Sequence, residues 1–348
     1  MRKELQKHMS KKTTMSDIAK ELGISTVTVS KALSGQKGVS EEMRQKIFDL
    51  ARDMGYQKSF SNQANESYKI GVLIGGRYIG NIDSFYGHMY QIFSAKAAKM
   101  GSYTMLEILS DADEKNLVFP KIIGDGTVDA VVIMGTLSEE YLTMLDEQLE
   151  IPTFYMDFTD RDHKKDSVIS GNYYGAYILT NYLFDKGHKD IGFVGTVLST
   201  PSITDRYLGY VRAMMEHGME INKDWILNDR GINNDKVDFE KNTSFPKGKL
   251  PTAFVCNCDL SANMFIQYLK VKGYRVPEDI SLVGYDDFLF ADGASLGITT
   301  YKVDMDEMVS RTLKRIKHAL RGEKYRSGLS IVEGYLVERE SVKDLNKR

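Results

Sequence analysis

The chain has 348 residues, of which 42% are hydrophobic and 27% are charged, and its formal net charge is −2. Such a composition is typical of soluble globular proteins, and no run of about 18 apolar residues is present to span a membrane. The charge is uneven, because residues 1–58 contain 12 Lys and Arg against 7 Asp and Glu, whereas the remainder contains 34 against 41. The length predicts two or three domains, and a basic head on an acidic body favours a head that meets phosphate.

The first 13 residues are basic and lack an apolar stretch, so we expect a basic extension rather than a signal peptide. The only cysteines, Cys256 and Cys258, lie two apart on a predicted strand, where they point to the same face and are badly placed to bridge each other. They have no partnering His or Cys for zinc. These features predict a cytoplasmic protein with no metal and no cofactor.

Residues 14–58 predict three short helices. Thr14 can cap the first, and Gly23 ends it. The second follows after a tight turn and spans 26–33, and Ser40 can cap the third. Two helices joined by a short turn, with a third as support, form a helix-turn-helix unit.

The second helix has two unlike faces. Val29 and Leu33 lie four apart and should face the core, while the opposite side is small, hydroxylated and singly basic, which suits the major groove of DNA. An ordinary three-helix bundle with a solvated face is the alternative. The candidate DNA-contacting residues are Ser25, Thr26, Val27, Thr28, Ser30, Lys31 and Ser34.

Several motifs of this head have fixed spacing: Asp17-Ile18-Ala19, Gly23-Ile24-Ser25, TVSKAL at 28–33, VSEE at 39–42, and Gly55-Tyr56. Together they resemble the signature of the lactose-repressor/galactose-repressor (LacI-type) family of transcription factors. The resemblance implies a homodimer that reads a two-fold operator in double-stranded DNA.

Residues 59–68 are polar and predict a linker. The resemblance implies a hinge helix here that folds on DNA and wedges a Leu pair into the minor groove. The Pro-Asn opening and the Ala-Arg-x-x-Leu core of such a hinge are absent. We therefore expect residues 57–67 to stay largely disordered off DNA and to insert no Leu wedge.

From Lys69 onward, apolar strands alternate with helices, which predicts doubly wound parallel sheets covered on both faces. A break near 158–170 suggests two lobes. The predicted strands are 70–74, 103–109, 130–134, 152–157, 191–195, 252–257 and 280–285, and the predicted helices include 85–99, 172–186, 205–217 and 259–272.

Further motifs, GHKDIGFVG at 187–195, DRYLGY at 205–210, VPEDISLVGYDD at 276–287 and LVERES at 336–341, are similar to LacI-type effector domains. The resemblance implies the two-lobed fold of type-I periplasmic sugar-binding proteins on residues 69–348. It implies three chain crossings, which we place near Gly171, Tyr301 and Ser327. Lobe 1 is then about 69–170 and 302–326, and lobe 2 about 171–301 and 327–348.

Ligands of open α/β sheets lie beyond the carboxyl ends of the strands. Arg206 is expected to open a helix after one strand and to offer a bidentate fork, and Asp286 to accept hydrogen bonds at the end of another. The competing readings are core packing for the aromatic residues, a surface role for Arg206 and helix caps for Asn172 and Asn257. The candidate effector-binding residues are Ser84, Phe85, Tyr86, Asn172, Arg206, Cys258 and Asp286. Cys258 stands where several sugar-responsive relatives have Asn.

No phosphate-cradling GxxxxGK[ST] loop, HExxH or GxSxG motif is present, so we expect no enzyme. The sequence predicts a ligand-responsive, sequence-specific DNA-binding regulator, most simply a repressor of carbohydrate-utilisation genes released by a small sugar. The alternatives are a regulator that needs a purine or sugar phosphate as co-repressor, and a sugar-binding module without DNA function. The resemblance places the helix from Asp259 at the dimer interface.

Overall fold

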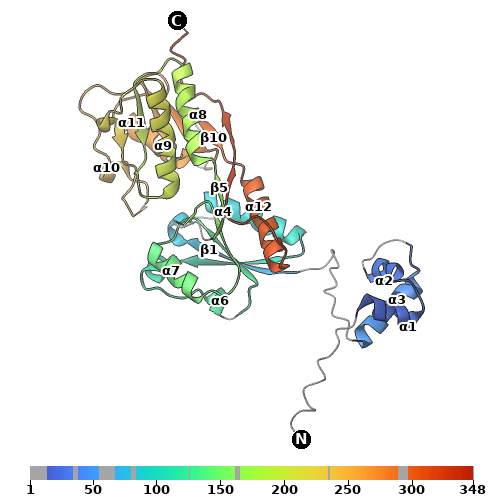
Figure 1. Ribbon diagram of the computed structural model, residues 1–348. Helices are drawn as coiled ribbons and strands as arrows, with labels where there is room; N and C mark the ends of the chain where they lie inside the picture. Colours follow the sequence, from blue (N-terminus) through green and yellow to red (C-terminus); the bar gives the residue numbers. More distant parts are fainter. Residues whose placement is uncertain are drawn as a thin grey trace. The chain divides into compact units, whose positions relative to one another are not determined.

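The computed structural model describes residues 14–33, 38–54, 67–79, 84–124, 126–160, 165–233, 236–288 and 297–347. The chain divides into two compact units, with the boundary in the sequence between Ser67 and Tyr68 (Figure 1). The predictions for the basic extension, for Ser34 and for the linker up to residue 66 lie outside the described residues. None of the helices in the described part of the chain has the length and apolar character that a bilayer crossing requires.

The first unit contains the three predicted helices, α1 (Met15–Leu22), α2 (Thr26–Leu33) and α3 (Glu41–Asp53). The Thr14 hydroxyl accepts from the Asp17 amide at 3.3 Å, and the Asp17 carboxylate accepts from the Thr14 amide at 2.7 Å, so α1 begins in a capping box. Gly23 ends the helix with a φ of 65°. The small core is made of fully buried apolar side chains from all three helices, namely Ile18, Val29, Ala32, Ile47 and Ala51.

The third helix also fixes the end of the second. Arg44 Nη1 donates to the carbonyl oxygen of Ala32 at 2.8 Å. The last carbonyls of a helix have no partner within it, so this bond satisfies one of them and holds α2 against α3. The helix that carries the outward face of α2 is therefore held in place by α3.

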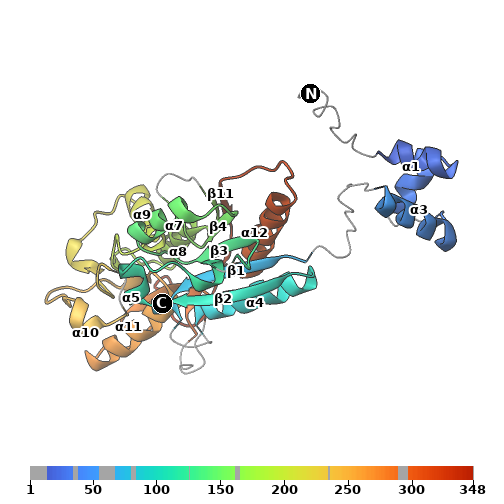
Figure 2. The same cartoon turned by 90° about the horizontal axis from the view of Figure 1, so that it is seen from below.

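The second unit is built around two six-stranded sheets, each with helices on both sides, as predicted (Figures 1 and 2). The first sheet has the order β11-β5-β4-β3-β1-β2, and its paired strands are all parallel. Its strands are β1 (Lys69–Gly75), β2 (Tyr103–Leu109), β3 (Ala130–Met134), β4 (Thr153–Met156), β5 (Asp166–Ser170) and β11 (Leu329–Val332). Its helices are η1 (Gly76–Tyr78), α4 (Phe85–Lys99), α5 (Asp111–Lys115), α6 (Lys121–Gly124), α7 (Glu139–Gln148) and α12 (Met305–Leu320).

The second sheet has the order β12-β10-β9-β8-β6-β7, with β12 antiparallel to β10. Its strands are β6 (Ile191–Val194), β7 (Ile226–Leu227), β8 (Ala253–Cys256), β9 (Ser281–Asp286), β10 (Thr299–Lys302) and β12 (Tyr335–Val337). Its helices are α8 (Asn172–Asp185), α9 (Pro201–Glu216), η2 (Lys223–Trp225), α10 (Phe239–Asn242) and α11 (Asp259–Val271).

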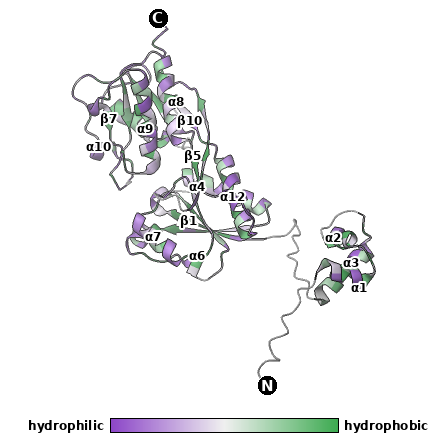
Figure 3. Cartoon of the chain, viewed as in Figure 1, coloured by the Kyte–Doolittle hydropathy of each residue, from purple (hydrophilic) through white to green (hydrophobic). Residues whose placement is uncertain are grey.

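Burial explains why these strands read as continuous apolar runs. Every residue of β3, β4, β6 and β8 is buried, because helices cover both faces of each sheet. Figure 3 shows the consequence: β1 is mostly green, whereas α12 carries purple and green stretches. The six buried side chains of α12 recur at helical spacing, as expected for a helix with one face on a core.

The chain passes between the two sheets three times. It leaves the first sheet at Gly171, after β5, and returns to it between β10 and α12. The third crossing, predicted near Ser327, instead lies at residues 333–334, because β11 pairs with β5 in the first sheet. A break in the alternation of strands and helices was predicted near 158–170, but this region contains β5. β11 is an edge strand with a single buried residue, so it lacks the apolar run that marked the other strands.

Two further expectations are wrong in detail. Arg206 does not open its helix: α9 starts at Pro201, with Thr200 as its cap, so Arg206 lies in the second turn. Pro at the first helical position after a capping Thr is the signal for that start. Cys258 does not lie on a strand; it caps α11, while Cys256 ends β8, and both thiols are free.

Candidate ligand and nucleic-acid sites

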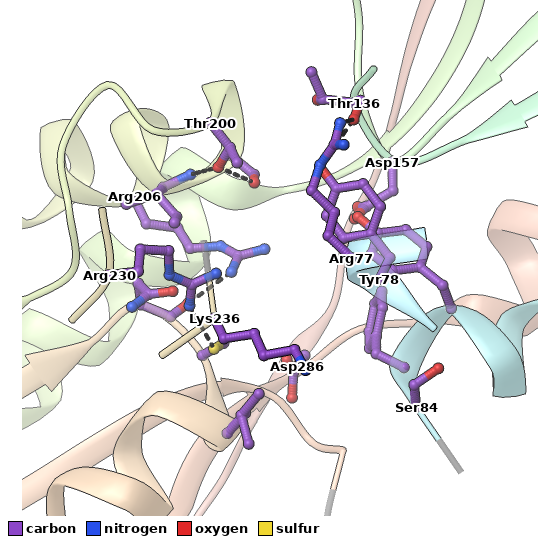
Figure 4. A pocket seen from close by; sticks show the side chains of 17 residues that line it. Arg77, Tyr78, Ser84, Thr136, Asp157, Thr200, Arg206, Arg230, Lys236 and Asp286 are labelled. Atoms are coloured by element: carbon purple, nitrogen blue, oxygen red, sulfur yellow. Dashed lines mark hydrogen bonds between the residues drawn. The ribbon is translucent and has the colours of Figure 1, made fainter. Parts of the chain in front are cut away.

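A cavity of about 360 Å³ lies between the two lobes of the second unit, within the size range of small-molecule sites. Figure 4 shows that side chains from the first lobe, including Arg77, Tyr78 and Asp157, face Arg206 and Arg230 of the second. Six of the seven predicted effector-binding residues line it, namely Ser84, Phe85, Tyr86, Arg206, Cys258 and Asp286.

The first-lobe wall is built on the start of α4. Ser84 caps this helix through a bond from the Gly87 amide at 3.1 Å, which aims Phe85 and Tyr86 at the cavity. The Tyr86 hydroxyl donates to Oδ2 of Asp157 at 2.7 Å. The Asp157 carboxyl is 6% exposed, and its Oδ1 has no hydrogen-bond partner among the described residues. Burial raises the pKa of Asp157, although Arg206 opposes the shift.

The aromatic residues pack on one another as well as on the cavity. The Tyr78 and Tyr86 rings have centroids 4.8 Å apart, and Phe85 meets Phe288 edge to face at 6.0 Å. Phe288 follows β9 of the second lobe, so this last contact joins the two walls. Phe85 and Tyr86 therefore pack against other side chains and also line the cavity. From the sequence, these two roles were predicted as alternatives.

Arg206 is the central side chain of the second-lobe wall, and only 7% of it is exposed. Its Nε donates to Oδ1 of Asn172 at 2.8 Å, and its Nη1 donates to the carbonyl oxygen of Asn257 at 2.6 Å. Asn172 itself does not line the cavity. Its role in the structure is to hold Arg206, because it sits behind the guanidinium rather than beside the ligand space.

Asp286 ends β9 with a φ of 103°, a strained conformation for a residue other than glycine. Burial raises the pKa of this carboxyl to about 7, with Arg206 opposing the shift. Next to it lies Asp259, 1% exposed, whose two carboxyl oxygens have no hydrogen-bond partner among the described residues. Burial, and then the charge of Asp286, raise the pKa of Asp259 well above its ordinary value. Both groups are therefore biased towards the protonated form.

Cys258 is a polar cap rather than a reactive group. Its Sγ accepts from the Ser261 amide at 3.4 Å. Burial raises the pKa of the thiol to about 11, so it stays protonated at neutral pH. The described residues contain no cluster of three or more His, Cys, Asp or Glu that could hold a metal ion.

Several cavity residues were missed by sequence reasoning. Arg77, Thr136 and Asp157 each follow a strand of the first sheet, and the rule about carboxyl ends of strands could have found them. Arg230 and Lys236 lie in the loop after β7, which has only two residues and gives no strand signal. The remaining lining residues are Tyr78, Thr200, Ser202, Ile203, Asn257 and Leu260.

The second site is the outward face of α2. Val29 is fully buried, whereas Thr26, Val27 and Lys31 are exposed, and 60% of the Val27 side chain is accessible. The Ser25 hydroxyl accepts from the Thr28 amide at 3.0 Å and caps the helix. Two more predicted residues, Thr28 and Ser30, are partly exposed on the same helix.

Both units of the chain match families of known proteins. A model of the bacterial regulatory proteins of the lacI family matches residues 14–59, and a model of the periplasmic binding protein-like domain matches residues 180–342. The HTH-type transcriptional repressor PurR of Vibrio cholerae serotype O1 (strain M66-2) is 26% identical over 338 residues, covering 96% of this chain and 99% of that protein.

Two solved structures show the same fold. The transcriptional regulator CelR in complex with cellobiose has a TM-score of 0.66 at 19% identity, covering 94% of this chain and 99% of that one. The Lac repressor dimer bound to operator and the anti-inducer ONPF has a TM-score of 0.61 at 19% identity, covering 96% and 100%. The chain therefore carries a DNA-binding domain of the lacI family of bacterial regulatory proteins, joined to a periplasmic-binding-protein-like domain.

Proposed function

We propose that this protein is a sequence-specific transcriptional repressor that acts as a homodimer on operator DNA and is controlled by a small polar molecule bound between its lobes. The observation that carries the proposal is the cavity: its walls come from both lobes, in a chain whose head belongs to a DNA-binding family. A ligand that contacts both walls favours one arrangement of the lobes, and it shifts the equilibrium only by the difference between its affinities for the two states.

The chemistry of the walls supports a ring that bears hydroxyl groups, such as a sugar. Arg206 supplies donors, Oδ1 of Asp157 supplies an acceptor that has no partner among the described residues, and Phe85 and Tyr86 supply an aromatic surface. A sugar hydroxyl both gives and takes a hydrogen bond, so it matches such a mixed lining. Genes for carbohydrate use are then the expected targets.

A second candidate reverses the sign of the response, with the ligand required for DNA binding. The aromatic group of Tyr78, Phe85 and Tyr86 supports a flat co-repressor such as a purine, because a purine ring gains from stacking against aromatic side chains. The sign of its effect is decided by the test below. The two candidates differ in what the ligand does to DNA affinity.

The test starts with selection of an operator from randomised DNA duplexes by the purified protein. We expect a two-fold symmetric site, bound with an affinity that falls steeply as salt rises. Sugars and nucleobases are then added during anisotropy measurements on that site: release by a sugar supports induction, and tighter binding supports the co-repressor variant. Failure to select any sequence above background would refute the repressor and leave a ligand-binding module.

A further inference from the structure

One surface of the second unit is strongly basic, although the unit as a whole has more acidic than basic residues. Residues 308–332 contain seven Lys and Arg but a single acidic residue, Glu323. Lys314, Lys317 and Arg321 recur at intervals of three and four, so they share the side of α12 that points away from its buried residues. The charge continues into the loop between α12 and β11. The cations are therefore gathered on one side of the first lobe.

Carboxylates match only part of this charge. The matched cations are Arg311, 2.7 Å from Glu307, Arg315, 3.4 Å from Asp166, and Arg321, 3.7 Å from Glu323. Glu323 is shared, because its Oε2 lies 2.6 Å from Nδ1 of His318. The other four form no ion pair with a carboxylate in the described part of the chain, and we call them the basic surface: Lys314, Lys317, Lys324 and Arg326. Lys317 is half-buried, and the other three are exposed.

The loop that carries Lys324 and Arg326 is anchored to the first sheet. Between these two residues lies Tyr325, whose hydroxyl donates to Oδ2 of Asp166 at 2.5 Å. The amide of Gly328 donates to Oδ1 of the same carboxylate at 2.6 Å. Because the loop is already held in place, little conformational entropy is lost when its two cations meet a partner.

The basic surface lies at the edge of the first sheet where its strands begin. Arg311 Nη1 donates to the carbonyl oxygen of Ile331 at 3.0 Å, and one turn later Arg315 Nη1 donates to that of Gly328 at 2.6 Å, so α12 runs towards the amino end of β11. The paired strands of this sheet are parallel, so β1 begins at the same edge. Tyr68, just before β1, is the first residue of the second unit. The chain from the DNA-binding unit therefore enters at this edge, and α12 lies on that side of the first lobe in both views (Figures 1 and 2).

The chemistry of the basic surface favours nucleic acid over a protein partner. Residues 305–328 are all described, and none of them is an exposed large apolar side chain. Protein interfaces are enriched in aromatic and apolar residues at their centre, whereas interfaces with DNA are more polar and much more positively charged. Leu329 and Ile331 are exposed nearby, but Ser330 between them accepts a hydrogen bond from Arg311 of α12. Leu329 and Ile331 therefore point to the opposite face of the sheet.

We propose that the basic surface binds the phosphates of DNA while the head is on its operator, so that the second unit adds a sequence-independent contact to the sequence-reading helix α2. Duplex DNA carries one negative charge per about 1.7 Å of its axis, and each phosphate that a Lys or Arg neutralises releases counterions. The inference rests on the proposed function, because operator binding by the head is what brings DNA near the edge at Tyr68.

The test compares the salt dependence of operator affinity in two full-length double variants by anisotropy. Lys324→Gln/Arg326→Gln removes two cations of the basic surface and should lower the slope of log affinity against log salt by about 1.8 per protomer, since each phosphate contact contributes about 0.9. Lys189→Gln/Lys223→Gln removes the same charge from exposed positions of the second lobe and should keep the wild-type slope. Both variants should melt at the wild-type temperature, because the altered side chains are exposed.

Two results would overturn the proposal. A wild-type slope in Lys324→Gln/Arg326→Gln would show that the basic surface does not meet DNA, and an acidic protein would then be the remaining occupant. An equal loss in the control variant would show a general effect of net charge rather than a contact. The loss should also be the same when the base pairs outside the operator are changed, because phosphate contacts carry no sequence information.

The same measurements separate this proposal from the proposed function. If wild type selects an operator and all variants share its salt slope, only the basic surface is wrongly assigned. If wild type selects no operator, the repressor function is wrong, and the slopes on unselected duplex DNA still test the basic surface.

Discussion

The guanidinium carbon of Arg206 lies 3.8 Å from the centre of the Tyr285 ring. The ring is fully buried at the end of β9, and its hydroxyl donates to Ser170 Oγ at 3.3 Å. Stacking on an aromatic face favours the planar arginine fork over a lysine ammonium, which has no plane to stack. Residues from α9 and β9 therefore fix one donor group in a single orientation.

Arg206→Lys tests whether the orientation of this group matters beyond its charge. Lysine keeps the charge but loses the stack and at least one of the two internal hydrogen bonds, so effector affinity should fall about tenfold or more. Operator affinity without ligand should not change, as judged by anisotropy. Arg212→Lys is the matched control, because Arg212 lies on the same helix and pairs with Glu216 at 2.8 Å. Equal effector affinity in Arg206→Lys and wild type would contradict a role for the fork.

The raised pKa of Asp286 predicts a pH dependence of stability with a definite sign. Between an unfolded pKa near 3.8 and a folded pKa of about 7, the unfolded chain has lost a proton that the folded protein still holds. Stability should therefore fall as pH rises through this window. Asp286→Asn should raise the melting temperature at pH 8 and have a smaller effect at pH 5.

The control for this experiment is Asp279→Asn. Hydrogen bonds from Arg275 lower the pKa of Asp279, so its replacement should cost a little stability at pH 8 and nothing at very low pH. Scanning calorimetry from pH 2 to pH 8 measures both variants. If the melting temperature changes by the same amount between pH 5 and pH 8 in wild type and in Asp286→Asn, then Asp286 ionises with an ordinary pKa and the prediction is wrong.

Lys31 on the exposed face of α2 is predicted to contact operator DNA. Lys31→Ala should cost about 1–3 kcal/mol and relax specificity at one position if the contact is to a base. If the contact is to phosphate, the loss is uniform and the salt slope falls by about 1. Lys46→Ala, which removes an exposed charge paired with Glu42 on α3, is the comparison. Unchanged affinity, specificity and salt slope in Lys31→Ala would remove this residue from the interface.

Gly209 permits the close packing of α9 on α8. A Cβ at this position would lie 2.1 Å from the backbone carbonyl oxygen of Tyr173, a contact that neither helix can relieve by moving a side chain. Gly209→Ala should therefore destabilise the second unit by about 1–3 kcal/mol or more. Gly248→Ala, with no atom within 4 Å of the new methyl group, should be neutral or slightly stabilising. Urea unfolding curves of both variants distinguish the two outcomes.

Elements with strong local signals were predictable. The helix α4 and the strand β3 have the predicted bounds, because Ser84 caps α4 and every residue of β3 is buried. The strand β2 also has the predicted bounds, although it lies at a sheet edge and buries one residue. The strands β11 and β12 were not predicted, since each is short, lies at a sheet edge and buries at most one residue. Pairing with distant strands, rather than local pattern, makes them strands.

The residues that line the cavity likewise include some that local sequence patterns predict and others that they do not. Arg206 and Asp286 stand in motifs that follow apolar strands, and both line the cavity as expected. Lys236 sits in an irregular loop, and its position depends on how the chain returns from β7 to α10, for which no local pattern exists. Asp229, the buried partner of its neighbour Arg230, also accepts hydrogen bonds from Thr196, Asn257 and Ser261, and these contacts depend on the tertiary fold.

The late position of β11 and β12 along the chain has a consequence for biosynthesis. The first sheet lacks its β11 edge until residues 329–332 have been made, and the second lacks β12 until residues 335–337 follow. A ribosome that releases residues from the N-terminus onward therefore cannot deliver one finished lobe before the other. Both lobes therefore keep an unpaired strand edge until residues 329–337 have been made, and a premature stop just before Leu329 would leave two incomplete sheets instead of one intact lobe.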